Sequence, residues 1–360
     1  MYFSRTFHPE NTGGKLAGQD IWCSQADGPG SWTPASNHFP LINNKNNNVV
    51  IGQSRDGNIL YLLNHYTSGN YMEFGLSAWD TASKEAPVKI DVPGLNIQSS
   101  YYGFYMHPDG EVLLISAQME KSKGREDIYI ALRDSNGIWQ KPFNVGGAIN
   151  SSGFEMSPYI TDDLKHIYFA SSGRGGKGGV DIFISARRGD NWRDWQPAKN
   201  MGNKINSRGF DAYFTIHNDQ AYFCSNRDSE FSEIYSSRVI SKKELEALLP
   251  KAVTVYFSLN SYIINAESKI ILDDIVKLLK ENKHLKVLVS GYTCRLGNEA
   301  DNLKLAEMRS YSVSDYLQIY GIDDDLIATR TMGDKEAKKL DKVESIQKKF
   351  RKVTITFKNL

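Results

Sequence analysis

Residues 157–185, SPYITDDLKHIYFASSGRGGKGGVDIFIS, decide the fold of most of this 360-residue chain. A turn signal at Thr161-Asp162-Asp163 precedes an alternating segment, KHIYFAS, and a glycine-rich stretch then leads into a second apolar segment, DIFIS. Alternation of apolar and polar residues indicates β-strands, and clusters of Asp, Gly and Ser between them indicate turns. The stretch therefore predicts two antiparallel strands joined by a loop, which cannot bury both of their faces alone.

The same pattern recurs along the first two thirds of the chain. Strands that follow a turn signal are expected at 54–63, 107–116, 161–171 and 217–225, and MYFSR opens the chain with another. Each is followed by a second strand, and the central apolar residues of these strands are 53, 54, 54 and 52 residues apart: Ile21, Phe74, Ile128, Ile182 and Ile234. Three units continue with a Trp-Pro segment and then an Ile-Asn step, at Ile42-Asn43, Ile149-Asn150 and Ile205-Asn206. Each unit thus predicts four short strands.

A repeat of this length indicates a β-propeller, because units placed radially cover the faces of their neighbours. We expect residues 1–239 to form an all-β propeller of five four-stranded blades, with Trp residues packed between blades. The first unit lacks its opening strand and the last lacks its Trp-Pro strand, so a sixth blade encoded upstream stays open. A β-sandwich is disfavoured because it needs no fixed period. The Ser-Pro, Asp-Gly and Asp-Ile-Phe/Tyr steps of residues 1–238 resemble the propeller repeat of the TolB family, which implies a fold more than a task.

The repeat region shows no recognisable catalytic or metal-binding motif. Its histidines are scattered, and His107 and His217 fall at turns where solvated side chains are expected. The segment 172–179 lacks the ending and the helix of a phosphate-binding loop, so we interpret it as a blade loop. Three acidic residues are expected to cap turns and not to bind calcium: Asp20, Asp162 and Asp163. No catalytic residue, metal or cofactor is therefore expected.

Bulk composition excludes some functional classes. The 43 basic residues nearly balance the 42 acidic ones, which disfavours a nucleic-acid partner. No stretch reaches the ~18 apolar residues of a transmembrane helix. MYFSRTFHPENTGG has no charged segment followed by an apolar one, so no export signal is visible. Cys23, Cys224 and Cys294 match neither a disulfide framework nor a zinc motif.

After residue 240 the predicted secondary structure changes from strands alone to a mixture of helices and strands. ISKKELEALLPKA (240–252) predicts a helical linker, capped by Ser241 and ended by Pro250. Beyond it, strands are expected at 253–260, 285–293 and 350–357, and helices at 266–283 and 299–321. Residues 326–334 are expected to form a short strand or an extended loop, followed by a charged helical stretch. The first helix should bury one apolar face: Ile270, Ile271, Ile275, Leu278 and Leu279. Residues 253–360 therefore predict an α/β domain with a mixed sheet.

Four separated blocks of this domain, VYFSLNSYII, GYTCRLGNEADNLKLAEMRSYSVSDYLQIYGI, MGDKEA and FRKVTI, carry a resemblance. In order and spacing they are similar to the OmpA-like C-terminal domain, over residues 253–357. The resemblance implies non-covalent binding of peptidoglycan through the diaminopimelate of its stem peptide. An ammonium and a carboxylate on one carbon are held best by an anion and a guanidinium on opposite sides.

The resemblance also implies the site residues: Tyr292, Thr293, Cys294, Asn302, Leu305, Arg309 and Arg351. Three positions depart from the family pattern, since Cys294 replaces an Asp, Ala306 a Ser and Phe350 an Asn. A neutral thiol removes a charge-assisted contact worth about 1.5–3 kcal/mol. Glu299 or Asp301 could supply the missing carboxylate, and the domain could alternatively serve only as a packing or interaction module.

Two functions follow as hypotheses. The first is a non-catalytic scaffold: a propeller face binds a protein partner, and residues 253–357 bind peptidoglycan. Chains that combine a propeller with an OmpA-like domain resemble envelope lipoproteins, some of them associated with secretion machinery. That implies a periplasmic place at the outer membrane, through a lipid anchor on an N-terminal part that this chain lacks. The alternative is a propeller hydrolase or lyase that acts on glycans or peptides, with the C-terminal domain as its wall anchor.

Overall fold

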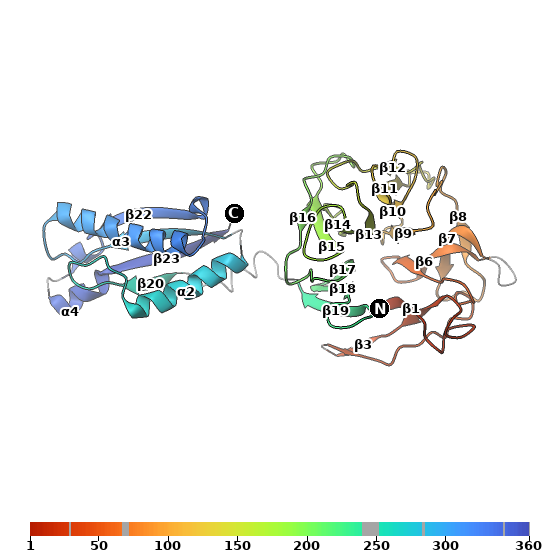
Figure 1. Ribbon diagram of the computed structural model, residues 1–360, viewed down its shortest axis with the longest axis horizontal. Helices are drawn as coiled ribbons and strands as arrows, with labels where there is room; N and C mark the ends of the chain where they lie inside the picture. Colours follow the sequence, from red (N-terminus) through yellow and green to blue (C-terminus); the bar gives the residue numbers. More distant parts are fainter. Residues whose placement is uncertain (29, 67–71, 240–251, 283–284, 341–342, 360) are drawn as a thin grey trace. The chain divides into compact units, whose positions relative to one another are not determined.

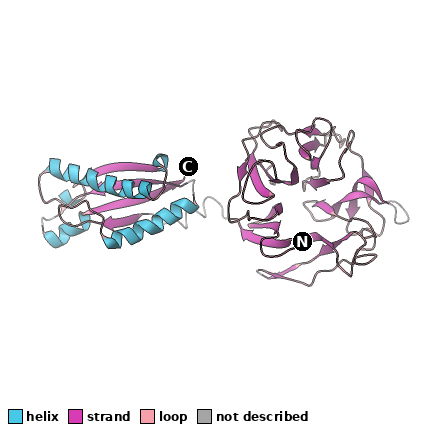
Figure 2. Cartoon of the chain, viewed as in Figure 1, coloured by secondary structure: helices cyan, strands magenta, loops and turns pink. Residues whose placement is uncertain are grey.

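The computed structural model describes the chain except for residues 29, 67–71, 240–251, 283–284, 341–342 and 360. The chain divides into two compact units, Met1–Val239 and Ile240–Leu360. Residues 240–251 of the predicted helical linker lie outside the described residues. Figure 2 shows the helices gathered in the second unit, whereas the first is built of strands and loops.

The first unit contains a run of short strands (Figure 1). In chain order they are β1 (Tyr2–Thr6), β2 (Gln19–Cys23), β3 (Ala26–Gly28), β4 (Ser31–Trp32), β5 (Val50–Gln53), β6 (Ile59–Tyr66), β7 (Met72–Asp80), β8 (Val88–Ile90), β9 (Tyr102–Met106), β10 (Val112–Ala117), β11 (Asp127–Leu132), β12 (Phe143–Asn144), β13 (Glu155–Ile160), β14 (His166–Ser171), β15 (Asp181–Ala186), β16 (Lys199–Asn200), β17 (Asp211–His217), β18 (Gln220–Ser225) and β19 (Glu233–Arg238). The two main strands predicted for each unit lie on them, but the Ile-Asn steps are turns, and the fourth strand is the one that opens each sheet, such as β13.

These strands form a series of small antiparallel sheets. Three sheets have four strands in sequence order, β5–β8, β9–β12 and β13–β16, and the next has three, β17–β19. The pairs β1–β2 and β3–β4 precede them. As expected, the first and last units of the repeat are thus shorter than the middle ones within the described residues.

Neighbouring sheets bury their faces against each other. Four apolar clusters each combine side chains from two successive sheets; for example, Ile128 and Ile130 of β11 share a cluster with Ile167 and Phe169 of β14. The same cluster contains Trp195, which agrees with the expected packing of Trp residues between units. The first strands of successive sheets also contact one another, β5 with β9, β9 with β13 and β13 with β17.

The Ile-Asn steps have a structural role that the sequence did not reveal. The buried Asn150 side chain accepts from the Ile128 backbone N–H at 2.8 Å and donates to the Ile128 carbonyl at 3.0 Å. Asn206 does the same to Ile182, at 2.8 and 2.9 Å, and Asn43 to Ile21. Each amide thus pairs with strand backbone groups that the short outer strand does not reach. This pairing matters because a buried backbone group without a hydrogen bond is costly.

Two expectations for polar residues of the repeat have opposite outcomes. Asp20 and Asp163 accept hydrogen bonds from backbone N–H groups of Thr12 (2.8 Å) and Lys165 (3.1 Å), in agreement with turn capping. The expectation that His107 is solvated is wrong, since it is 1% exposed. Its Nδ1 lies 2.8 Å from Asp109 Oδ2 within the turn that joins β9 to β10, so the ring is held inside the hairpin turn and not in solvent.

The second unit is a mixed sheet with two long helices (Figure 1). Its elements are β20 (Val253–Tyr256), α2 (Ala266–Glu281), β21 (Leu285–Tyr292), α3 (Glu299–Ile319), η1 (Asp324–Leu326), β22 (Ile327–Gly333), η2 (Ala337–Lys339), α4 (Glu344–Gln347), η3 (Lys348–Phe350) and β23 (Lys352–Asn359). The strand order is β20-β23-β21-β22, and only the β21–β22 pair is parallel. This is the predicted mixed α/β architecture.

The core of this unit lies between the sheet and the two helices. Asn265 caps α2 and Asn298 caps α3, each accepting from a backbone N–H of the first turn, and Gly321 follows α3 with a φ of 87°. The predicted apolar face of α2 wrongly includes Ile270, which is 67% exposed. The buried face contains Leu272, Ile275, Val276 and Leu279, because this spacing keeps closer to one side of the helix. None of the helices described is long and apolar enough to span a membrane.

Candidate functional site

The predicted site lies where β21 ends against α3. Gly291 allows the close approach, because a Cβ at this position would lie 2.0 Å from the backbone oxygen of Ala306. Ala306, one of the three departures from the family pattern, is fully buried at this contact. The tight packing brings the segment after β21 next to the inner face of the helix that carries Arg309.

Arg309 is the centre of the site. Its Nη1 donates to the Tyr292 carbonyl at 3.0 Å, its Nη2 to the Ser258 carbonyl at 3.0 Å and its Nε to the Ser261 carbonyl at 2.8 Å. The guanidinium carbon lies 5.3 Å from the centre of the Phe257 ring. The side chain has no solvent exposure, so in this conformation the segment from Ser258 to Ser261 closes the site.

The positive charge of Arg309 has no carboxylate in contact among the described residues. Burial lowers its pKa to about 10, an effect that Cys294 opposes and Arg351 adds to. The group is therefore a cation at neutral pH. Three carbonyl dipoles compensate it only in part, and a buried charge without a full counter-charge favours an anionic ligand.

Arg351 adds a second buried cation. Its side chain is 4% exposed, and Nη1 contacts Glu344 Oε1 at 2.7 Å. Its buried Nε makes no hydrogen bond within the described part of the chain. Of the two guanidinium groups, Arg351 pairs with Glu344, whereas Arg309 contacts only backbone carbonyls.

Cys294 occupies an apolar environment. It is 4% exposed and packs with Ala337, Phe350 and Leu296. Two of the departures from the family pattern, Cys294 and Phe350, therefore lie in one cluster. A single sequence shows both exchanges but not their contact, because the two positions are more than fifty residues apart. The thiol and the ring together replace two polar side chains by apolar packing.

Thr293 and Asn302 hold the turn in place. The Thr293 N–H donates to the Gly333 carbonyl at 2.9 Å, and its hydroxyl donates to the Asn302 carbonyl at 3.3 Å. Asn302 Nδ2 donates to Asp334 Oδ2 at 3.2 Å. Asp334 lies in the MGDKEA block and is not among the predicted site residues. Only its side-chain contact shows this bracing role.

The remaining candidates lie around this centre. The ring of Tyr292 is 4.8 Å from the Lys352 ammonium, and its pKa is raised, first by burial and then by Glu336. Leu305 is half-buried on α3. Neither alternative carboxylate faces Arg309: Glu299 pairs with Lys338 at 2.8 Å, and Asp301 accepts from Asn298 at the start of α3.

Comparison with known proteins bears on this unit. Residues 256–351 match the model of the OmpA family. The peptidoglycan-associated lipoprotein of Buchnera aphidicola subsp. Baizongia pistaciae is 26% identical over 131 residues, which are 36% of this chain and 70% of that protein. Outer membrane protein A of Buchnera aphidicola subsp. Schizaphis graminum is 35% identical over 112 residues, 29% of this chain and 30% of that protein. The chain thus spans less than a third of the length of this second relative.

Solved structures give the same likeness. The crystal structure of the peptidoglycan-associated lipoprotein from Burkholderia pseudomallei is 23% identical and has a TM-score of 0.28, with 29% of this chain and 89% of that chain covered. The C-terminal domain of MotB from Helicobacter pylori is 21% identical, also with a TM-score of 0.28, over 30% of this chain and 85% of that chain. The likeness of the C-terminal unit to OmpA-like domains rests on the family model matched by residues 256–351.

Proposed function

We propose that this chain is a non-catalytic scaffold of the cell envelope, whose second unit, residues 253–360, binds peptidoglycan. The observation that carries this proposal is the position and charge of Arg309. The guanidinium lies against the turn after β21, as the family pattern requires, and no carboxylate contacts it among the described residues. A carboxylate of the stem-peptide diaminopimelate would supply the missing anion.

Binding requires the segment over Arg309 to move. The carbonyls of Ser258 and Ser261 occupy two edges of the guanidinium, so a ligand carboxylate would replace them. This exchange is favourable because a bidentate ion pair is stronger than hydrogen bonds to neutral carbonyls. Leu259 in the covering segment is 50% exposed, and Ile263 just after it is 74% exposed. Little apolar packing therefore holds the covering segment in place.

The names of the relatives support a place at the cell wall. They are called peptidoglycan-associated lipoprotein and outer membrane protein A. We therefore propose a periplasmic location at the outer membrane, with attachment through an N-terminal lipid. Tyr292, Thr293, Cys294, Asn302, Leu305, Arg309 and Arg351 are the residues that we assign to peptidoglycan binding.

For residues 1–239 we propose a TolB-like β-propeller of five blades that presents a face to a protein partner. The consecutive strand order within each sheet and the contacts between successive first strands support radial packing. The Trp32 ring lies 6.1 Å from Tyr222 of β18, which joins the first and last sheets of the unit. Aromatic side chains are exposed on this unit, for example Tyr101 at 78%, and such surfaces favour protein contacts. A secretion machine is the assembly in which we would seek the partner first.

Sedimentation with purified sacculi tests the peptidoglycan assignment. The intact chain should bind sacculi that contain diaminopimelate and should bind at least tenfold more weakly to sacculi that contain lysine, which lacks the second carboxylate. Arg309→Lys should weaken binding about tenfold, since it keeps the charge and loses the fork of donors. Arg330→Lys, at an exposed arginine of β22, is the matched control. Equal binding to both sacculi, or no effect of Arg309→Lys, would contradict the assignment.

A further inference from the structure

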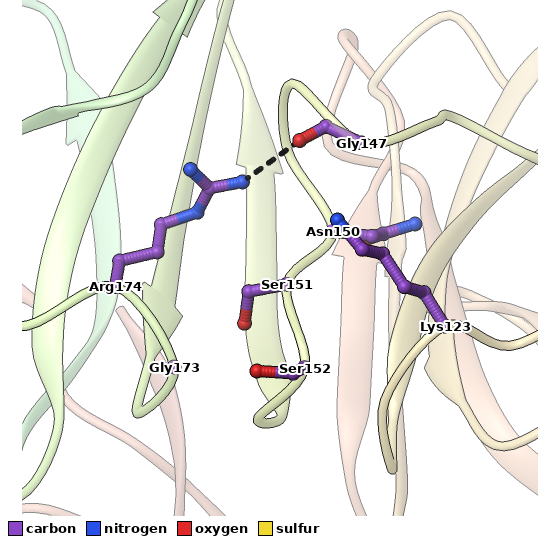
Figure 3. A pocket seen from close by; sticks show the side chains of 7 residues that line it. All are labelled: Lys123, Gly147, Asn150, Ser151, Ser152, Gly173 and Arg174. Carbon is purple, nitrogen blue, oxygen red and sulfur yellow. Dashed lines mark hydrogen bonds between the residues drawn. The ribbon is translucent and has the colours of Figure 1, made fainter.

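A polar pocket of about 320 Å³ opens in the first unit, where the sheets β9–β12 and β13–β16 meet. Three loops line it: the β10–β11 loop with Lys123, the β12–β13 loop with Asn150, Ser151 and Ser152, and the β14–β15 loop with Arg174. In Figure 3 the side chains of Arg174 and Lys123 approach from opposite sides, and the Ser152 hydroxyl lies below them. Both charged side chains of the lining are therefore cations.

Arg174 is fixed in a set direction by backbone carbonyls. Its Nε donates to the Ile149 carbonyl at 3.0 Å, and its Nη2 donates to the carbonyls of Ala148 at 2.9 Å and Gly147 at 3.5 Å. Nη1 makes no hydrogen bond within the described residues. Burial lowers the pKa of this guanidinium, and Glu155 opposes the shift. The pocket thus contains a guanidinium whose position is fixed by the protein.

Lys123 supplies a second, uncompensated charge. Its ammonium has no ion pair or hydrogen bond in the described part of the chain, and the side chain is exposed. Its backbone N–H instead donates to Asp127 at 2.7 Å, which fixes the base of the side chain at the pocket.

The carboxylates nearby are already engaged behind the pocket. Glu155 is fully buried and accepts from the Ser151 N–H at 2.9 Å, the Ser151 hydroxyl at 2.5 Å and the Ser171 hydroxyl at 2.8 Å. Asp127, also fully buried, accepts from the backbone of the Lys123 loop and from Asn144. These bonds partly satisfy both acids from within the protein, so neither needs the two cations.

The next junction of the repeat provides an internal comparison. There Arg227 occupies the place of Arg174 and likewise donates to a carbonyl of the Ile-Asn step, at Ile205. However, its Nη2 also lies 3.2 Å from Asp211 Oδ1, so a carboxylate neutralises it directly. At the junction of β9–β12 with β13–β16 the corresponding acid is Glu155, whose oxygens accept from serines; it acts on Arg174 electrostatically but makes no direct ion pair with it among the described residues.

We infer that this pocket is a binding site for a phosphoryl group carried by a larger molecule. Cations from two sides and a hydroxyl from a third suit the separated oxygens of a tetrahedral phosphate better than a planar carboxylate. The volume is within the range of small-molecule sites and exceeds what one inorganic ion fills, so the ligand is a phosphate ester. The site is independent of the peptidoglycan site of the second unit.

Titration calorimetry of the intact chain with glycerol phosphate tests this inference. Lys123→Met should weaken binding about tenfold, the loss expected for one charge-assisted contact. Ser152→Asp, at an exposed position on the pocket rim, should abolish binding without changing the melting temperature. Lys165→Met removes an exposed lysine from the opposite end of the β13–β14 hairpin and should leave the affinity within twofold.

Vesicles with and without phosphatidylglycerol distinguish the sources of the phosphoryl group. Binding to glycerol phosphate alone would assign the site to a soluble ester, and binding to the anionic vesicles as well would assign it to a lipid headgroup. Either result supports the site if Lys123→Met and Ser152→Asp reduce it. No detectable heat with glycerol phosphate, or equal losses in Lys123→Met and Lys165→Met, would overturn the inference.

Discussion

Replacing Cys294 by Asp should restore the anion that the proposed peptidoglycan site lacks. The thiol lies in the cluster of Leu296, Ala337 and Phe350 and interacts electrostatically with Arg309. An aspartate there is of similar size and places a carboxylate beside a buried guanidinium. The substitution therefore adds the group that would face the ammonium of diaminopimelate, while Arg309 faces the carboxylate.

The size of the gain follows from the contacts involved. A hydrogen bond between charged groups contributes about 1.5–3 kcal/mol, which is roughly a ten- to hundredfold increase in affinity. The apolar neighbours oppose it, since burying a carboxylate has a desolvation cost that pairing with Arg309 must offset. Cys294→Asn is the matched control, because it introduces the same shape without the charge.

Two measurements separate the charge effect from repacking. In the sacculus assay, Cys294→Asp should bind at least tenfold more tightly than Cys294→Asn. In thermal unfolding followed by helical circular dichroism at pH 7, Cys294→Asp should have a higher melting temperature than Cys294→Asn. Because Arg309 lowers the pKa of the new carboxylate, its stabilisation is present above about pH 4 and is lost as the pH falls through the folded-state pKa. Equal binding and equal melting of the two variants at pH 7 would show that position 294 does not face Arg309 or the ligand.

Three further predictions concern the fold that supports the sites. Asn206→Ala should lower the free energy of unfolding of the first unit by about 1–3 kcal/mol, since it leaves the backbone N–H of Ile182 unpaired, whereas the Ile182 carbonyl keeps its bond from the Met201 N–H. All six tryptophans precede residue 240, so their fluorescence in urea reports this unit alone. Burial raises the pKa of Tyr159 to about 12. The unfolded chain therefore loses this proton first, so Tyr159 alone should contribute a fall in stability of about 1.4 kcal/mol per pH unit between pH 10 and 12. Tyr159→Phe should reduce that slope in the same assay. Gly291→Ala should destabilise the second unit by about 3 kcal/mol in circular dichroism, because its Cβ would meet Ala306.

Local pattern predicted the elements better than it predicted their contacts. The strands of the repeat and the main elements after residue 253 could be assigned because periodicity and turn residues act over short distances. The burial of His107 could not, since it depends on how a hairpin packs within the unit. The same limit applies at the C-terminal site. The resemblance identified Arg309 and Cys294, but the cover formed by Ser258 and Ser261 is visible only in the structure.

The pocket of the first unit shows how the construction of the repeat can generate a binding site. Because Asn150 satisfies the backbone of β11, the chain can leave the sheet early and return as the β12–β13 loop. That loop exposes the carbonyls of Gly147 to Ile149, which attract and orient Arg174. The bonds that fix Arg174 direct its Nη2 toward the carbonyl of Gly147, on the side of the pocket where Lys123 lies (Figure 3). The pairing of Arg227 with Asp211 at the next junction shows that this outcome is not an automatic product of the repeat. Glu155, with its oxygens bonded to two serines, takes the place of the acid that pairs directly with an arginine at the next junction, and the pocket beside Arg174 is the site that we propose for an anion.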